Sequence, residues 1–573
     1  MENIINKAKK WLDESFDAET RKEVQRMIDK DHALLTESFY KDLEFGTGGL
    51  RGIMGVGSNR MNKYTVGMAT QGLSNYLIKN FPNTKIKCAI AFDCRNNSDY
   101  FAKISASVLS ANGIKVYLFG SLRPTPELSF AIRHLQCHSG IVITASHNPK
   151  EYNGYKVYWQ DGGQIINPHD IGIINEVRNI KDLSQVKFDD NLINVEIIGE
   201  DIDNAYINKL SELILNPEDI KKSNLKIVFT PIHGSTVDIL PKALRKVGFT
   251  DINIVEEQAI PDGNFPTVAS PNPEEASALS MAIEKAKKIK ADIVMGTDPD
   301  GDRLGIVVRQ KNGEYLLLNG NQTASILIYY LLEEWQKKGK QKGKEYIVKT
   351  IVTTELLSVI ASHYNVKSYD VLTGFKYIAE IIEKNYGKTT FIGGGEESYG
   401  FLAGEFVRDK DAVMSCMIMA EVAAWAKNRN ITLDELLIDI YIKFGYYLEG
   451  LKSLTKTGKS GLEEIQKMME KFRNQMPKSI NGIDIALVHD FEKRISIDKR
   501  NDSKHEITLP KSNVLQFELV DGTKITIRPS GTEPKIKFYV SVHDVLKNKE
   551  EYPQKTKELQ AKIDKIIETI TNF

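Results

Sequence analysis

Short apolar runs rich in β-branched residues alternate along the chain with polar or glycine-rich loops and with helical patterns. The first clear example predicts a strand over Ile86–Asp93, a helix over Phe101–Asn112 and a second strand over Ile114–Phe119. The same alternation returns with strands over Leu225–Thr230 and Tyr346–Val352. Because strands that alternate with helices typically build layered α/β units, the pattern predicts three α/β blocks up to about residue 440.

The end of the chain has a different pattern. Strands are predicted over Lys524–Arg528 and Lys535–Val542, and a helix over Gln554–Ile570 follows them. This order favours a smaller C-terminal α+β domain. Lysine-rich stretches at residues 336–345 and 452–473 are predicted to be surface excursions between ordered elements.

The length of 573 residues agrees with this division, since about 150 residues per domain gives about four domains. We therefore expect three mixed α/β domains followed by the smaller α+β domain. The predicted boundaries place them at residues 1–200, 201–318, 319–445 and 446–573.

Composition and charge narrow the range of partners. Hydrophobic residues make up 41% and charged residues 27% of the chain, which excludes a disordered protein. Lys and Arg total 76, as do Asp and Glu, so the net charge is zero. A neutral chain has no general attraction to nucleic acid or to anionic membranes, and we expect it to bind neither. An anionic ligand must then be held by a local site.

Several features favour a cytoplasmic protein with reduced thiols. The four cysteines show neither C-x-x-C spacing nor histidines at zinc-ligand spacings. The best apolar run, Ile326–Leu332, is far shorter than the roughly 18 residues of a membrane span. The first residues contain no apolar signal core, so we expect no export. None of these features indicates an oligomeric state.

A strand predicted over Ala291–Thr297 leads directly into a turn with three aspartates, Asp298, Asp300 and Asp302. Carboxylates crowded into one turn need a cation. An EF-hand calcium loop is excluded, because Arg303 and Arg309 occupy the places of its glycine and its glutamate. Oxygen ligands with room for a phosphate oxygen suit Mg²⁺. The alternative is a solvated acidic turn.

Ser146 follows another apolar strand and is flanked by His147, Asn148 and Pro149. These residue types permit a nucleophile with His147 as its base, and they equally permit an ordinary turn. A hydrolase triad is not indicated, because no Gly-x-Ser-x-Gly elbow surrounds the serine. A phosphorylated serine fits better, since its acceptor oxygens would complete the coordination of a cation held by the three aspartates.

Two further loops carry groups that suit a sugar phosphate. The segment 528–535 collects groups that can cradle a phosphate, with a basic β-turn as the alternative; they belong to Arg528, Ser530, Gly531, Thr532 and Lys535. The segment 395–400 places Glu396 and Ser398 between glycines that permit close backbone approach, which suits hydrogen bonds to sugar hydroxyls.

Six motifs in this order resemble the α-D-phosphohexomutase superfamily, and in particular its phosphoglucomutases. They span nearly the whole chain and are Phe45–Arg51, Thr144–Pro149, Asp298–Arg303, Thr373–Lys376, Gly395–Gly400 and Arg528–Thr532. The resemblance implies three related α/β domains and a C-terminal domain around one cleft. The loop at 395–400 is similar to the glucose and pentose branch, whereas the loop from 528 is similar to the clamp of compact bacterial mutases.

The resemblance also implies a role for each matching residue. Ser146 corresponds to the phosphorylated serine, which together with Asp298, Asp300 and Asp302 holds Mg²⁺. Proton transfer or phosphate contact in the cleft is implied for Arg51, His147, Lys156 and Lys376. Arg303 corresponds to the residue that steadies the transferring phosphoryl group. The remaining substrate contacts are implied for Thr373, Gly374, Glu396, Ser398, Arg528, Ser530, Gly531, Thr532 and Lys535.

The implied activity is the interconversion of glucose 1-phosphate and glucose 6-phosphate through the phosphoserine, with glucose 1,6-bisphosphate as intermediate and activator. A phosphopentomutase or a phosphomannomutase of the same superfamily is the nearest alternative. Two other classes stay open. In a haloacid-dehalogenase-type phosphatase Asp298 would be the nucleophile, although Asp302 stands where that motif usually has Thr or Val. A catalytically silent sugar-phosphate sensor would use the same cleft.

Overall fold

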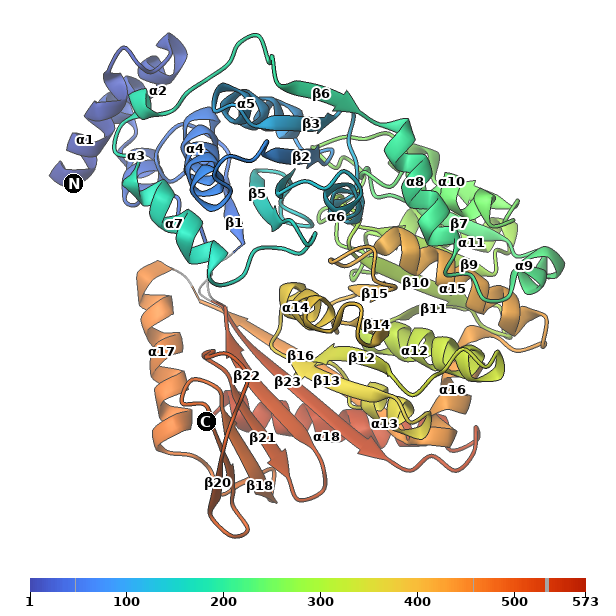
Figure 1. Cartoon of the computed structure of the whole chain (residues 1–573). Coiled ribbons are helices and arrows are strands. Elements are labelled where there is room, and N and C mark those ends of the chain that lie inside the picture. Colours follow the sequence, from blue (N-terminus) through green and yellow to red (C-terminus); the bar gives the residue numbers. More distant parts are fainter. Residues whose placement is uncertain (47, 457, 531–534) are drawn as a thin grey trace. The chain divides into compact units, whose positions relative to one another are not determined.

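The alternating pattern folds into four β-sheets flanked by helices in a computed structural model, which describes residues 1–46, 48–456, 458–530 and 535–573 (Figure 1). The chain divides into two compact units. The first comprises Met1–Asn319, Ala379–Phe391 and Ser398–Thr432. The second comprises Gly320–Ile378, Ile392–Glu397 and Leu433–Phe573.

The first sheet lies in the first unit and confirms the strands predicted near residues 86–93 and 114–119. Across the sheet the strands are β1 (Gly49–Ile53), β5 (Tyr152–Trp159), β4 (Ser139–Ile143), β2 (Lys87–Phe92), β3 (Lys115–Phe119) and β6 (Val195–Ile198). The last four are parallel, whereas β5 is antiparallel to β4 and β1 to β5. The helices of this part are α4 (Lys63–Asn80), α5 (Ser98–Ala111), α6 (Thr125–His134) and α7 (His169–Asn179).

The first sheet is apolar because its central strands are covered. Every residue of β4 is buried, and β2 buries Cys88, Ala89, Ile90 and Ala91 completely. Both α5 and α6 pack against β2 and β4. Near-continuous burial is typical of parallel strands with covered faces, and it leaves the loops at the strand ends as the places for polar chemistry.

A second sheet in the first unit carries the aspartates at one of its hairpins. Its order is β11 (Tyr315–Leu318), β10 (Leu304–Arg309), β9 (Ile293–Thr297), β7 (Ile227–Thr230) and β8 (Ile252–Ile254). The strands β9, β7 and β8 are parallel, and β10 runs antiparallel to β9. The helices here are α8 (Glu200–Ser211), α9 (Pro217–Ser223), α10 (Ile239–Lys246), α11 (Ser280–Ile289) and α15 (Ala412–Lys427).

The N-terminal residues form a small helical core of their own, for which the apolar pattern predicted no element. The helices are α1 (Glu2–Lys9), α2 (Ala18–Lys30) and α3 (His32–Phe39). The rings of Trp11 and Phe16 stack with centroids 4.7 Å apart, and Tyr64 of α4 joins the same cluster. Aromatic burial of this kind ties the segment to α4.

The third sheet contains the strand predicted near residues 346–352. Its order is β13 (Lys367–Val371), β12 (Glu345–Thr350), β14 (Thr390–Gly395) and β15 (Phe401–Ala403), with β12 and β13 parallel. The helices of this region are α12 (Gly320–Lys337), α13 (Leu356–His363), α14 (Phe375–Asn385) and α16 (Leu433–Phe444).

The C-terminal part is the predicted α+β domain. Its antiparallel sheet has the order β16 (Tyr446–Thr455), β23 (Lys535–Asp544), β22 (Lys524–Pro529), β21 (Leu515–Leu519), β18 (Ile483–Asp490), β19 (Ile495–Asp498) and β20 (Ser503–Glu506), with β17 (Ser479–Ile480) beside β18. Two helices accompany it, α17 (Gly458–Asn474) and α18 (Tyr552–Thr571).

The lysine-rich stretch 452–473 is not the surface excursion that its composition predicts. It forms the end of β16 and most of α17. Ile465, Met469 and Phe472 are spaced at four and three residues and are buried. They form the apolar stripe of an amphipathic helix, and the lysines occupy its other faces.

Cys88, Cys94, Cys137 and Cys416 are free thiols, as their spacing predicts. Over the described ranges of the chain, we find no helix that is both long and apolar enough to cross a membrane.

Candidate active site

The loop between β4 and β5 presents Ser146 in an unusual backbone conformation. Its φ of 52° is in the left-handed region, and only 4% of the residue is exposed. The Ser146 hydroxyl donates to Asp298 Oδ2 at 2.8 Å, and its Oγ lies 3.1 Å from Nδ1 of His147. The serine loop and the aspartate loop therefore meet, although Ser146 and Asp298 are 152 residues apart.

The aspartate loop is a tight turn joining β9 to β10. Asp298 Oδ1 accepts hydrogen bonds from the backbone N–H groups of Asp302 at 3.0 Å and Arg303 at 2.9 Å. Gly301 has a φ of 68°, and an added Cβ would lie 2.6 Å from the side chain of Thr236. The turn therefore requires glycine there, both for its conformation and for space.

The three carboxylates fit a cation of the kind that prefers oxygen ligands. Asp298, Asp300 and Asp302 are each at most 2% exposed, and their ligand atoms all lie within 4.8 Å of one another. Among the described residues, the buried Oδ1 atoms of Asp300 and Asp302 have no hydrogen-bond partner. Buried carboxylate oxygens without donors are costly unless a cation binds them.

Burial and neighbouring charges shift the pKa values of the aspartates in this loop. Burial, followed by the charges of Asp300 and Asp302, raises the pKa of Asp298 well above its ordinary value. Burial alone would also raise the pKa of Asp300, but Lys156, the hydrogen bond with Asp298 and the charge of Lys410 together outweigh it and lower the pKa below the usual range. Three buried carboxylates repel one another, and a divalent cation would relieve that repulsion.

Two lysines surround the carboxylates. Lys156 Nζ lies 2.7 Å from Asp300 Oδ2 and 3.4 Å from Asp302 Oδ2. Lys410 Nζ lies 3.2 Å from Asp302 Oδ2 and was not among the predicted site residues. The only sequence feature that could have indicated it is the run of alternating charges at residues 408–411, directly before the apolar helix α15. By composition, a lysine in such a run is expected to be exposed to solvent.

The other predicted groups of the first unit lie in this neighbourhood. Strand β1 pairs with β5 so that Arg51 stands opposite Gly154, and Arg51 Nη1 donates to Asn148 Oδ1 at 3.2 Å. The Arg303 guanidinium forms an ion pair with Glu274. Burial, then the positive charges of Arg303 and Arg51, lowers the pKa of His147 well below its ordinary value. The imidazole is therefore neutral near pH 7.

The second unit brings together Thr373, Gly374 and Glu396. Gly374 has a φ of 122°, and its N–H donates to Glu396 Oε1 at 2.9 Å. The buried Thr373 Oγ1 has no hydrogen-bond partner within the described ranges. Lys376 follows in α14, where its Nζ lies 5.3 Å from the ring centroid of Tyr377.

Electrostatics link Glu396 and Glu397 with the C-terminal sheet inside the second unit. Burial and the charge of Glu396 raise the pKa of Glu397 to about 7, against the opposing charges of Lys537 and Arg528. Arg528 stands opposite Lys537 in the pairing of β22 with β23. A cationic pair beside these glutamates is the kind of surface that accepts an anion.

Three of the remaining predicted site residues are Ser530, whose backbone is described, and Gly531 and Thr532, which are not. The backbone N–H of Ser530 donates to the carbonyl of Lys535 at 2.7 Å. Gly531 and Thr532 lie outside the described residues. Ser398 belongs to the first unit and is partly buried.

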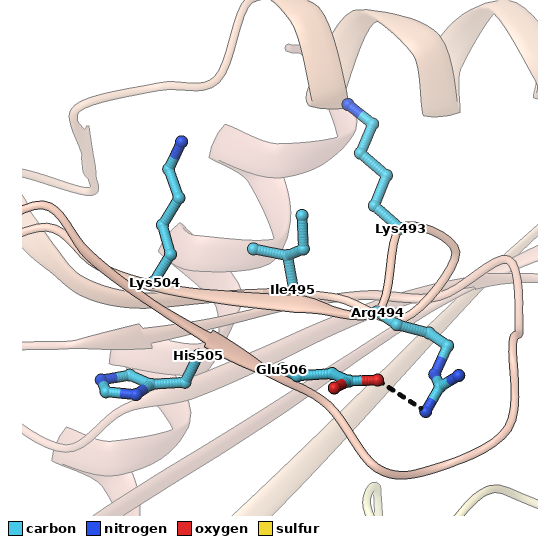
Figure 2. Close-up of a pocket in the computed structure, with 6 residues that line it drawn as sticks. All are labelled: Lys493, Arg494, Ile495, Lys504, His505 and Glu506. Carbon is cyan, nitrogen blue, oxygen red and sulfur yellow. Dashed lines mark ion pairs between the residues drawn. The ribbon is translucent and has the colours of Figure 1, made fainter.

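A surface pocket of about 410 Å³ lies elsewhere, on the hairpin β19–β20 of the second unit. Figure 2 shows its lining, Lys493, Arg494, Ile495, Lys504, His505 and Glu506. The ion pair between Arg494 and Glu506 measures 3.1 Å. None of the predicted site residues lines this pocket, so the chemistry is assigned to the serine and aspartate loops.

Three family models match the chain in sequence order. They are phosphoglucomutase/phosphomannomutase α/β/α domain I over residues 42–184, domain II over residues 204–313 and domain III over residues 319–444. The related α/β domains implied by the motif resemblance are thus confirmed.

Relatives over most of the chain agree with this match. A phosphoglucomutase of Staphylococcus epidermidis is 40% identical, covering 88% of this chain and 92% of the relative. A phosphoglucomutase of Staphylococcus aureus is 37% identical, covering 93% and 95%. The open form of parafusin, a Paramecium phosphoglucomutase, has a similar fold, with a TM-score of 0.66 at 18% identity over 89% and 91% of the two chains. The chain therefore belongs to the phosphoglucomutase/phosphomannomutase family.

Proposed function

We propose that the chain interconverts glucose 1-phosphate and glucose 6-phosphate through a phosphorylated Ser146. It is an intramolecular phosphotransferase, and its partners are small sugar phosphates. The observation that carries the proposal is the contact of the Ser146 hydroxyl with Asp298 inside a buried carboxylate cluster. The staphylococcal phosphoglucomutases, at 37–40% identity over nearly their whole length, support glucose phosphate as the substrate.

The serine lets one reactive centre serve both ends of a sugar. In the first step, the bond between phosphorus and Ser146 Oγ breaks and a bond to the free sugar hydroxyl forms. The hydroxyl proton passes to a nearby base, for which neutral His147 is a candidate, and Ser146 Oγ takes up a proton as it leaves. Against the effect of burial, the charges of Asp300 and Asp302 raise the pKa of Lys156, so this lysine stays protonated and can donate a proton but not accept one. The product is glucose 1,6-bisphosphate. In the second step, Ser146 Oγ forms a bond to the other phosphorus and gives its proton to the base, while the bond from that phosphorus to the sugar oxygen breaks and the sugar oxygen takes up a proton.

Charge and position account for most of the catalysis of such a transfer. Asp298, Asp300 and Asp302 would hold Mg²⁺ together with the phosphate on Ser146. When bound, Mg²⁺ would neutralise charge on the transferring group. Lys156 and Lys410 lie against the same carboxylates and add positive charge around the phosphate, while Arg303 steadies the transferring group.

Asp298 is a poor candidate for the nucleophile of a phosphatase. Its Oδ1 accepts two backbone N–H groups and its Oδ2 accepts the Ser146 hydroxyl. A carboxylate held in this way is occupied as an acceptor, and it would also serve as a metal ligand. The intact serine and carboxylate cluster also disfavour a silent sensor.

The family resemblance gives the remaining motif residues the role of binding the rest of the substrate. Arg528, Ser530, Gly531, Thr532 and Lys535 would clamp the phosphate that does not react. Glu396 and Ser398 would read the sugar hydroxyls, with Thr373, Gly374 and Lys376 as further contacts. The domain boundaries at residues 200, 318 and 445 remain part of the proposal, and each family match lies within one of the first three proposed domains.

Removing the clamp should weaken both directions of the reaction. Each orientation of the substrate leaves one phosphate away from Ser146, so Arg528→Ala deletes a charge-assisted contact worth about 1.5–3 kcal/mol in both. We expect kcat/KM to fall roughly ten- to a hundred-fold for glucose 1-phosphate and for glucose 6-phosphate. Arg494→Ala, in the pocket of Figure 2, is the matched control and should change neither. A loss confined to one substrate would contradict a single clamp.

Substrate choice tests the proposed function directly. Acceptors matched to an equatorial 2-hydroxyl lose a hydrogen bond when that hydroxyl is axial, at a cost of about 1–3 kcal/mol. We expect kcat/KM for glucose 1-phosphate to exceed that for mannose 1-phosphate roughly five- to a hundred-fold, and Glu396→Gln to narrow the gap. Coupled assays that compare kcat/KM for glucose, mannose and ribose 1-phosphates measure this preference. Equal glucose and mannose rates would refute the role of Glu396, and a dominant ribose rate would identify a phosphopentomutase.

A further inference from the structure

Arg95 is a buried arginine that the proposed reaction does not use. It lies in the loop after β2, and β2 pairs in parallel with β4 so that Phe92 stands beside Ile143. The loops that follow these two strands therefore start side by side at one edge of the sheet. Although arginine is rarely buried without a partner, the Arg95 side chain is 0% exposed.

The Arg95 guanidinium is bound by backbone carbonyls of the serine loop. Its Nη1 donates to the carbonyls of Pro149 at 2.9 Å and Tyr152 at 3.1 Å. Its Nη2 donates to the carbonyl of Ser146 at 2.6 Å and to that of Asn148. One side chain thus fixes four carbonyls spread over seven consecutive residues, 146–152, including the carbonyl of Ser146 itself.

The guanidinium is in turn held in place by Asp93. Arg95 Nε lies 3.5 Å from Asp93 Oδ2, and Asp93 Oδ1 accepts the Arg95 backbone N–H at 2.9 Å and the Ser98 hydroxyl at 2.7 Å. The Ser98 hydroxyl also accepts from the Asn153 side chain at 3.0 Å. Because Asn153 is in β5, the network extends to the strand that carries Lys156.

The backbone at Ser146 needs such support. A non-glycine residue with φ of 52° adopts a sparsely populated conformation, which persists only when its surroundings impose it. The direction of a serine hydroxyl is set by its backbone and by a few staggered rotamers. Fixing the carbonyl of Ser146 therefore also directs its Oγ toward the aspartate loop.

We propose that Arg95 is a positioning residue, which holds the backbone of 146–152 so that Ser146 and its phosphate face the three aspartates. It acts through the serine loop and does not contact the reacting atoms. The inference rests on the proposed phosphoryl transfer through Ser146.

Arg95→Lys tests the proposal, because a lysine ammonium is a point donor and cannot span four carbonyls as the planar guanidinium does. A misplacement of about 1 Å costs on the order of a hundred-fold in rate, so we expect kcat to fall about a hundred-fold. KM should change by less than about threefold, since the substrate contacts are untouched. Arg60→Lys is the matched control, because Arg60 is also buried in this unit but bonds to Ser38 and Glu37.

Hydrogen exchange gives a readout that does not depend on activity. We expect the amides of 144–152 to exchange faster in Arg95→Lys than in wild type, and to be unchanged in Arg60→Lys. If Arg95→Lys does not fold, Asp93→Asn removes the support of the guanidinium and should shift kcat and exchange in the same direction, less strongly. A kcat within about twofold of wild type, or unaltered exchange in 144–152, would overturn the proposal. Wild-type protein without mutase activity would instead refute the proposed function, while the exchange comparison would still test whether Arg95 holds the backbone of residues 146–152.

Discussion

Ser146→Ala should lose at least about a thousand-fold in mutase activity, because removing a covalent nucleophile removes the pathway and not merely a contact. The hydroxyl is the group that must carry the phosphate between the two halves of the cycle. It lies 2.8 Å from Asp298 Oδ2, so its loss also removes one contact between the serine and aspartate loops. The measurement is a coupled assay with glucose 1-phosphate, alongside intact-mass and peptide analysis of phosphate on the purified protein.

The phosphate analysis distinguishes Ser146 from Asp298 as the residue that carries the covalent phosphate. We expect active wild-type protein to carry roughly one phosphate at Ser146 and Ser146→Ala to carry none. Ser184→Ala, an exposed serine of the same unit, should keep both the activity and the modification. Phosphate trapped on Asp298 in wild-type protein would contradict the mutase mechanism and restore the phosphatase alternative.

Local sequence signals indicated the serine loop and the aspartate loop of the candidate site. Each of the two central loops follows an apolar strand, and β4 and β9 are buried along their whole length. Polar residues directly after such strands lie at a sheet edge, where ligands bind in open α/β folds. That argument placed Ser146 and Asp298 on functional loops, but it could not bring together residues 152 positions apart. Their contact was predicted first from charge, since a phosphoserine would complete the coordination of a cation held by the aspartates, and then from the family resemblance.

Residues whose roles depend on distant partners were not accessible to the same reasoning. Lys410 is in a run of alternating charges, which by composition is a solvated segment, yet its Nζ lies 3.2 Å from Asp302. Arg95 has no local motif that marks it, because its partners are carbonyls, and every residue has one. The helix α17 was not predicted because the lysine-rich composition of this stretch outweighed the spacing of its three buried apolar residues.

Removal of divalent cations should cause the second large loss of mutase activity. With phosphate on Ser146, the serine and the three aspartates carry about −5 charge within one buried site. Lys156 and Lys410 supply only part of the compensation. Burial, followed by the charges of the two neighbouring carboxylates, raises the pKa of Asp298, so the site without a cation disfavours further negative charge. A metal supplies several kcal/mol of charge stabilisation to such transfers, so chelation should reduce turnover by about a hundred- to a thousand-fold.

Asp300→Asn sharpens the test, because it keeps the shape of the side chain and removes one ligand charge. We expect the Mg²⁺ concentration for half-maximal activity to rise about tenfold or more, with activity restored in part at high Mg²⁺. Calorimetric titration with Mg²⁺ measures the same loss without turnover. Asp201→Asn, an exposed aspartate of the same unit, is the matched control and should leave the Mg²⁺ dependence unchanged. Because Lys156 Nζ lies 2.7 Å from Asp300 Oδ2, full activity in chelator would mean that the lysines alone balance the carboxylates, and the metal would have no place in the reaction.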